Sequence, residues 1–205
     1  IDKNPVSGIK LFKEDNQVTV SLSEEELGRL VNVLKTHPNR NACDVALFLL
    51  NTGLRISSAL QAKWEHIDIS QKTMLLPSSI SKSKRVSSIP LSFGALEILN
   101  GLKTKGKHEY LFVNPLTNKR LTTISKGWRS IRAEAGLPQL TLHGLRHVFS
   151  SNLINSGVSI FVLSKLLTHA NVITTTRYSH LDKSTLLDAT NTASHSIDEA
   201  LKKVS

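Results

Sequence analysis

The chain has 205 residues, and its 26 Lys and Arg against 16 Asp and Glu give a formal net charge of +10 at pH 7. A chain of this length can bury a sizeable core in one domain, and the excess of bases indicates a polyanionic partner, most often nucleic acid. The longest apolar runs are too short to span a membrane, so we expect none to be inserted. The one cysteine, Cys43, excludes an internal disulfide, is expected to pack in the core and fits a cytoplasmic protein.

Start and stop signals divide the first part of the chain into helices. Residues 1–20 contain Pro5 and Gly8 and are interpreted as a linker or arm. Because the sequence begins at Ile1 and not at methionine, we expect that a longer protein has been trimmed and that an upstream domain is missing. A capping box and a stop glycine then mark the helices. Ser23 with Glu26 starts the first expected helix, and the His37-Pro38 pair ends it. The second expected helix covers about 41–52 and stops at Gly53, and a third covers 56–63.

The middle of the chain predicts a small antiparallel sheet with a basic loop. The alternation over 64–69 indicates a strand entry, and two strands, 74–76 and 86–91, flank the sequence SSISKSKR. Further elements are expected as a helix over 93–102, a short strand over 110–113 and a helix over 122–135. Bases outnumber acids over 72–107 and again over 119–132. The predicted fold class is therefore mainly α with a small antiparallel β-sheet (α+β), bearing two basic patches.

The run from Thr141 to Leu181 concentrates polar side chains in a helical pattern. His143 and Arg146 are three apart, so a helix starting near Leu142 presents both on one face, opposite an apolar core-facing stripe. That stripe comprises Leu145, Val148, Phe149, Leu153 and Ile154. A second helix is expected over 160–167, followed by a weak, threonine-rich helix over 172–178. Residues 182–205 predict an amphipathic C-terminal helix or tail.

These side chains suit chemistry on a phosphate. Arg55 and Arg146 could each hold a phosphate through paired N–H donors, and cations favour the ionised form of a nearby tyrosine such as Tyr178. Lys82 or a histidine could protonate a departing oxygen. Taken singly, each residue is more often structural. His143 and His147 are spaced i, i+4, but Gly144 stands where a metalloprotease has its Glu, so we predict no metal and no cofactor.

Four segments in this order resemble the tyrosine recombinase (phage integrase) family: TGLR ending at Arg55, SKSKRVSSIPL, HGLRH from His143, and LLTHANVITTTRY. The resemblance covers about residues 21–181, which we therefore expect to be a catalytic domain, and it implies that the missing upstream domain binds DNA. It assigns catalytic roles to six positions. These are Arg55, Lys82, His143, Arg146, His169 and Tyr178, with Lys84 as the alternative lysine.

The resemblance implies a site-specific DNA recombinase that needs neither metal nor ATP. Tyr178 would form a 3′-phosphotyrosyl link, the two arginines and His169 would bind the phosphate, Lys82 would protonate the leaving oxygen, and His143 would assist the tyrosine. The expected partners are double-stranded DNA attachment sites, other protomers in a tetramer joined through the C-terminal segment, and accessory DNA-bending proteins. The expected location is the cytoplasm, at the bacterial nucleoid.

Two departures and two alternatives accompany this resemblance. The family commonly has an acidic residue three places after the first arginine, where this chain has Ser58, so we expect weaker support of the site there. It often has glycine before the later histidine, where this chain has Thr168. The alternatives are a type IB topoisomerase-like relaxing enzyme, which shares the nicking chemistry, and a DNA-binding module that has lost catalysis.

Overall fold

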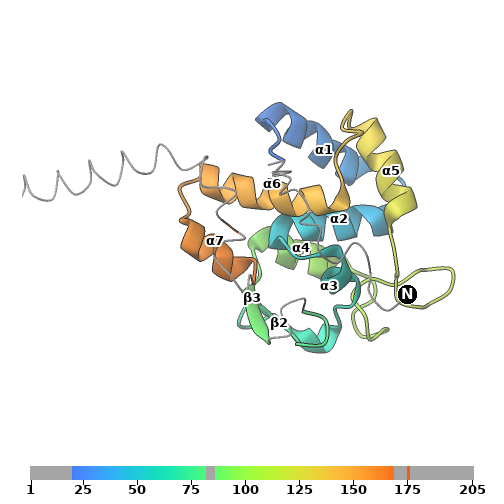
Figure 1. The fold of residues 1–205 in the computed structure, drawn as a ribbon. Helices are drawn as coiled ribbons and strands as arrows, with labels where there is room; N and C mark the ends of the chain where they lie inside the picture. Colours follow the sequence, from blue (N-terminus) through green and yellow to red (C-terminus); the bar gives the residue numbers. More distant parts are fainter. Residues whose placement is uncertain (1–19, 82–85, 169–174, 176–205) are drawn as a thin grey trace, which may run out of the picture.

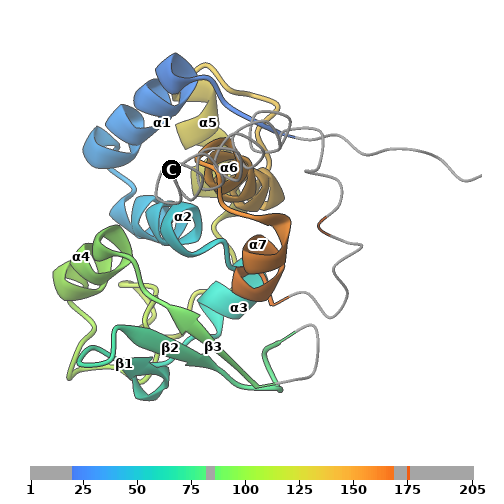
Figure 2. The same cartoon turned by 90° about the vertical axis from the view of Figure 1, so that its left-hand side faces the viewer.

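The computed structural model describes residues 20–81, 86–168 and 175. Within these ranges the chain forms helices and one small antiparallel sheet with strand order β1-β2-β3, as the sequence predicts. The elements are α1 (Glu24–Thr36), α2 (Arg40–Thr52), α3 (Ile56–Leu60), the 3-10 turn η1 (Trp64–His66), β1 (Ile67–Asp68), β2 (Thr73–Leu76), β3 (Ser87–Pro90), α4 (Phe93–Gly101), α5 (Ser125–Glu134), α6 (Leu142–Asn155) and α7 (Ile160–Leu166). The sheet lies at one end of the molecule and α1 and α5 lie at the other (Figures 1 and 2).

Helix α2 is the centre of the fold, because α1, α3, α4, α5 and α6 all pack against it. Its apolar side is buried, and Cys43 is fully buried there as predicted. The ring of Phe48 meets Phe112 edge to face, with 5.6 Å between centroids, which joins α2 to the loop after α4. A second, smaller apolar cluster of Ile154, Leu163 and Leu167 holds α7 against α6.

The predicted helix boundaries are confirmed where capping chemistry sets them. The backbone N–H of Glu26 donates to Ser23 Oγ (3.1 Å), and that of Ser23 donates to the Glu26 carboxylate (2.9 Å), which completes the capping box. Gly53 ends α2 in the left-handed conformation, with φ of 62°. A Cβ at this position would also overlap the ring of Phe149 on α6. Glycine is therefore required at 53 both by the turn and by the packing of α6.

The strand predicted at residues 110–113 is wrong. Only two isolated bridges form there, Lys63 with Tyr110 and Val113 with Arg120. Leu111 and Phe112 are both buried, so their apolar character reflects packing in the core and not the alternation of a strand. The third helix also ends at Leu60, earlier than expected, because the chain tightens into 3-10 geometry before η1. Helix α5 begins at Ser125, three residues later than predicted.

The N-terminal end of the described chain is attached to α6. The Ser151 hydroxyl, fully buried on α6, donates to the carbonyl of Val20 at 3.2 Å. Of the linker predicted at 1–20, Val20 alone is described. The helices predicted at 172–178 and 182–205 lie outside the described residues, apart from Thr175, which is buried. Among the helices of the described ranges, none has the length and apolar character needed to cross a membrane.

Candidate active site

Three of the six predicted site residues lie in the described chain: Arg55 at the start of α3, and His143 and Arg146 on the first turns of α6. The other three, Lys82, His169 and Tyr178, lie outside the described residues. The site geometry is therefore given by the turn between α2 and α3, the N-terminal half of α6, and the segments that contact them.

Helix α5 fixes the start of α6. The indole N–H of Trp128 (2.9 Å) and the guanidinium of Arg132 (3.2 Å) both donate to the carbonyl of Leu140. The next residue, Thr141, caps α6 by accepting from the backbone N–H of Gly144 at 2.9 Å. The helix that carries the two predicted site residues thus starts from a fixed point. No sequence motif marks Trp128 as support for this helix.

Arg146 joins three segments of the chain. Its guanidinium donates to the carbonyl of Gly53 (2.6 Å), which ends α2, and to that of Leu167 (2.8 Å), which follows α7. Only 5% of Arg146 is exposed. Gly53 lies two residues before Arg55 in the sequence, and Leu167 lies two residues before His169. Because an arginine has five N–H donors, bonding two carbonyls does not by itself exhaust its capacity to bind a phosphate.

The two residues of the HxxR pair differ in exposure, which corrects the expected arrangement of α6. His143 is exposed, whereas Arg146 is buried on a face that was expected to lie opposite the core. This face is buried because α2 and α7 both pack against α6. The ring of His143 meets that of buried His147 edge to face, with 4.8 Å between centroids and 85° between planes. His147 therefore supports one side of the exposed ring.

Arg55 differs from Arg146 in its surroundings. It is half-buried, its backbone is extended (φ −72°, ψ 142°), and its side chain has no hydrogen bond or ion pair within residues 20–81, 86–168 and 175. Desolvation lowers the pKa of its guanidinium from the ordinary value. Arginine nevertheless keeps its charge at neutral pH. A partly desolvated charge without an acidic neighbour is costly, and an anionic ligand would offset that cost.

Thr168 has an unusual backbone where the family often has glycine. Its φ is +52°, in the left-handed region that disfavours a β-branched residue. Glycine would adopt this backbone conformation without steric cost. Threonine is accommodated in this chain with its N–H bonded to the carbonyl of Lys165 at 2.9 Å.

A cavity elsewhere in the molecule does not involve the predicted residues. It has a volume of about 790 Å³, and its lining includes Asp44 and Asn51 of α2 and Glu97 of α4, but neither Arg55, His143 nor Arg146. Among the described residues, no three His, Cys, Asp or Glu side chains form a group that could hold a metal ion.

Comparison with known proteins places these residues in a wider context. Residues 20–185 match the model of the phage integrase family. The tyrosine recombinase XerC of Bacillus pumilus is 30% identical over 203 residues, which cover 91% of this chain and 65% of that protein. The integrase of Haemophilus phage HP1 is 31% identical over 193 residues, which cover 91% of this chain and 51% of that protein. The crystal structure of XerA recombinase matches with a TM-score of 0.66 and 25% identity, over 85% of this chain and 65% of that one. The chain thus spans about half to two thirds of the length of these relatives.

Proposed function

The chain belongs to the phage integrase family, and from that premise we propose that it is the catalytic domain of a tyrosine site-specific recombinase. It would cut and rejoin DNA through a 3′-phosphotyrosyl intermediate. The observation that carries this proposal is Arg55, a half-buried cation without a partner in the described chain, next to the turn that Arg146 holds. Such a cation is suited to one phosphodiester anion.

The two arginines would bind the non-bridging oxygens of the scissile phosphate. Arg55 would neutralise the anion. Arg146 would hold the α2–α3 turn and the end of α7 together and would also donate to the same phosphate. Charge accumulates on these oxygens in the transition state, so donors fixed before the reaction stabilise it more than they stabilise the substrate. His169, which carries over from the family motif, would add a further donor.

Tyr178 would be the nucleophile and Lys82 the general acid. The phenolic oxygen of Tyr178 forms a bond to phosphorus as the bond to the 5′-oxygen breaks, and His143 assists removal of the phenolic proton. Lys82 protonates the departing 5′-oxygen, with Lys84 as the alternative. Attack of a 5′-hydroxyl from a partner strand reverses these steps and exchanges strands. Because the phosphotyrosyl link retains the bond energy, the scheme needs no ATP, and none of its steps needs a metal.

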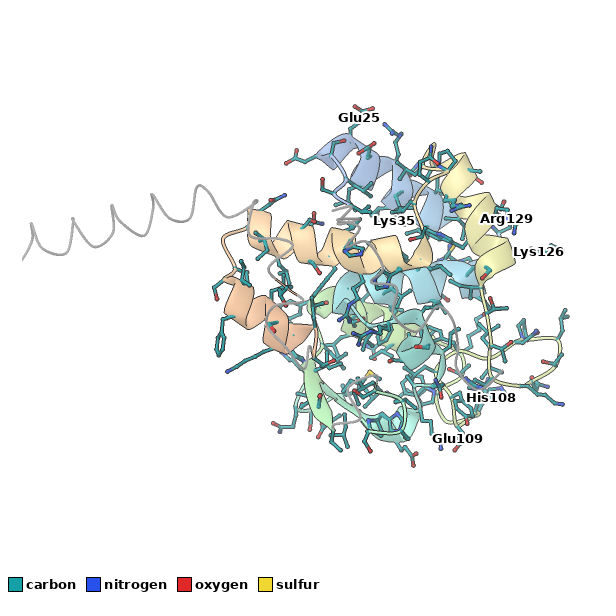
Figure 3. The ribbon with its side chains drawn as sticks, in the orientation of Figure 1. Glu25, Lys35, His108, Glu109, Lys126 and Arg129 are labelled. Carbon is teal, nitrogen blue, oxygen red and sulfur yellow. The ribbon has the colours of Figure 1, made fainter. Side chains whose placement is uncertain are left out.

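The DNA partner is supported by the net charge of +10 and by the exposed bases of α5. Figure 3 shows Lys126 and Arg129 pointing outward from this helix. Phosphate contacts by such side chains make binding strongly dependent on salt concentration. We further propose a tetramer on two DNA sites, joined through residues 182–205 and aided by DNA-bending proteins. The protein would act in the cytoplasm on chromosomal DNA.

Trapping the covalent adduct tests the proposal. The substrate is a nicked duplex with the attachment site, from which the strand beyond the cut diffuses away so that religation cannot occur. We expect the unmodified chain to give a complex that survives denaturation and Tyr178→Phe to give none. The sequence has two tyrosines, so Tyr110→Phe is the matched control and should retain the adduct. An adduct with Tyr178→Phe would refute the assignment of the nucleophile.

A second assay separates recombination from strand relaxation. A recombinase should exchange flanks between two cognate sites, giving junction products of predictable length. A topoisomerase-like enzyme should instead relax supercoiled plasmid regardless of site. Efficient relaxation without exchange would favour the topoisomerase alternative, and binding without any adduct would favour the DNA-binding module.

A further inference from the structure

Ser58 makes a hydrogen bond to the loop that follows β2. It is the third residue of α3 and is 2% exposed, and its hydroxyl donates to the carbonyl of Ile80 at 2.9 Å. Ser81, the next residue of the loop, is 6% exposed. In Figure 2, α3 lies directly above the sheet, as this bond requires. The hydroxyl therefore ties α3 to the β2–β3 connection.

The local backbone explains why a hydroxyl suits this position. The carbonyl of Pro77 accepts from the backbone N–H groups of both Ile80 (3.2 Å) and Ser81 (3.0 Å). At Ile80 the loop presents a carbonyl to α3, and a carbonyl requires a donor. A carboxylate offers acceptors only, so the acid common in the family would face another acceptor here. Ser58 is thus a matched partner for this carbonyl, so the chain has a contact to the loop at this position although it lacks the acid.

One helical turn separates the hydrogen bond of Ser58 from Arg55. Arg55 precedes α3, and its carbonyl accepts from Ala59 at 3.0 Å, which closes the turn that contains Ser58. Ile80 precedes Lys82 by two residues in the sequence. We propose that Ser58 is a positioning residue for Lys82, setting the loop that carries the general acid relative to the arginine that binds the phosphate. This inference rests on the role proposed above for Lys82.

The test uses two DNA substrates that differ in the leaving atom. In one the 5′-bridging oxygen of the scissile phosphate is unchanged, and in the other sulfur replaces it. With sulfur, the tyrosine oxygen bonds to phosphorus and the P–S bond breaks to release a thiolate. A thiol has a pKa near 8.5, far below that of an alcohol, so its departure needs no general acid. A defect in proton donation should therefore disappear with sulfur, whereas a defect in folding, binding or phosphate contact should remain.

We expect Ser58→Ala to slow cleavage of ordinary DNA about 10- to 100-fold, as for a displacement of about 1 Å in a reacting group. On the sulfur substrate it should cleave at close to the unmodified rate, as should Lys82→Ala. Ser57→Ala is the matched control, because Ser57 is the exposed neighbour on the same turn. It should behave normally on both substrates.

A pair of variants of equal shape guards against a general packing defect. Ser58→Thr and Ser58→Val add similar bulk, but only threonine keeps the hydroxyl, so Thr should cleave ordinary DNA markedly faster than Val. The proposal is overturned if the Ser58→Ala defect persists on sulfur DNA while that of Lys82→Ala disappears. If sulfur does not restore Lys82→Ala, the assigned acid is wrong and the inference falls with it. If the unmodified chain forms no adduct with either substrate, the proposed function itself is refuted.

Discussion

The surroundings of Arg55 and Arg146 differ although both residues occur in family motifs. Arg146 is 5% exposed and spends two donors on the carbonyls of Gly53 and Leu167. Arg55 is half-buried and has no partner among the described residues. Arg146 thus links the turn after α2 to the end of α7, whereas Arg55 makes no such link among the described residues and binds the phosphate only under the proposed function. Substitution of Arg55 should therefore lower activity alone, whereas substitution of Arg146 should lower both activity and stability.

The largest expected effect is on cleavage in Arg55→Ala. Removing one phosphate donor should lower the rate of adduct formation about 100- to 1000-fold. The same change should alter the free energy of unfolding by less than about 1 kcal/mol, because no bond within the described protein is lost. Single-turnover adduct assays and denaturant unfolding measure the two quantities. A large loss of stability would show that Arg55 has a structural role like that of Arg146.

Arg146→Lys should damage both properties. A lysine cannot bridge two carbonyls in the manner of a planar guanidinium, so we expect the free energy of unfolding to fall by about 2–3 kcal/mol. Adduct formation should fall far more than DNA binding. Arg55→Lys is the matched control and should leave stability nearly unchanged. Equal stability of the two lysine variants would remove the distinction between the two arginines.

Gly53→Ala tests the turn between them. The left-handed backbone and the overlap with Phe149 together should lower the free energy of unfolding by about 2 kcal/mol. Combining it with Phe149→Leu should recover part of that loss, since the smaller side chain makes room for the added methyl group. Thermal unfolding of the two single variants and the double variant measures the coupling. Strict additivity would mean that the ring does not constrain residue 53.

The smallest effect is expected for Thr168→Gly. Relief of the left-handed strain, offset by the greater freedom of glycine in the unfolded chain, should raise the free energy of unfolding by up to about 1 kcal/mol. Thr122, which is exposed and does not have a positive φ, supplies the control. Thr122→Gly should give no gain. A destabilised Thr168→Gly variant would show that the threonine side chain contributes more than its backbone strain costs.

Local chemistry made much of the fold predictable. The capping box of Ser23 and Glu26 and the stop at Gly53 depend on neighbours within four residues, and both were located from the sequence. The run at 110–113 was misassigned because burial against a helix and pairing in a sheet both select apolar residues. Periodicity over four residues does not distinguish them.

The site was predictable as a set of residues but not as an arrangement. Helical spacing puts His143 and Arg146 on one face, yet it does not reveal what packs against that face. The carbonyls that bind Arg146 come from residues 93 and 21 positions away in the chain. The bond between Ser58 and Ile80 likewise spans 22 positions. Such contacts are decided by tertiary packing, which a single sequence does not display.

The hydrogen bond between Ser151 and Val20 links the start of the described chain directly to α6. Val20 is the first described residue, and its carbonyl is held by the same helix that bears His143 and Arg146. A displacement of Val20 would therefore act on α6 about two turns beyond His143, without passing through any other element.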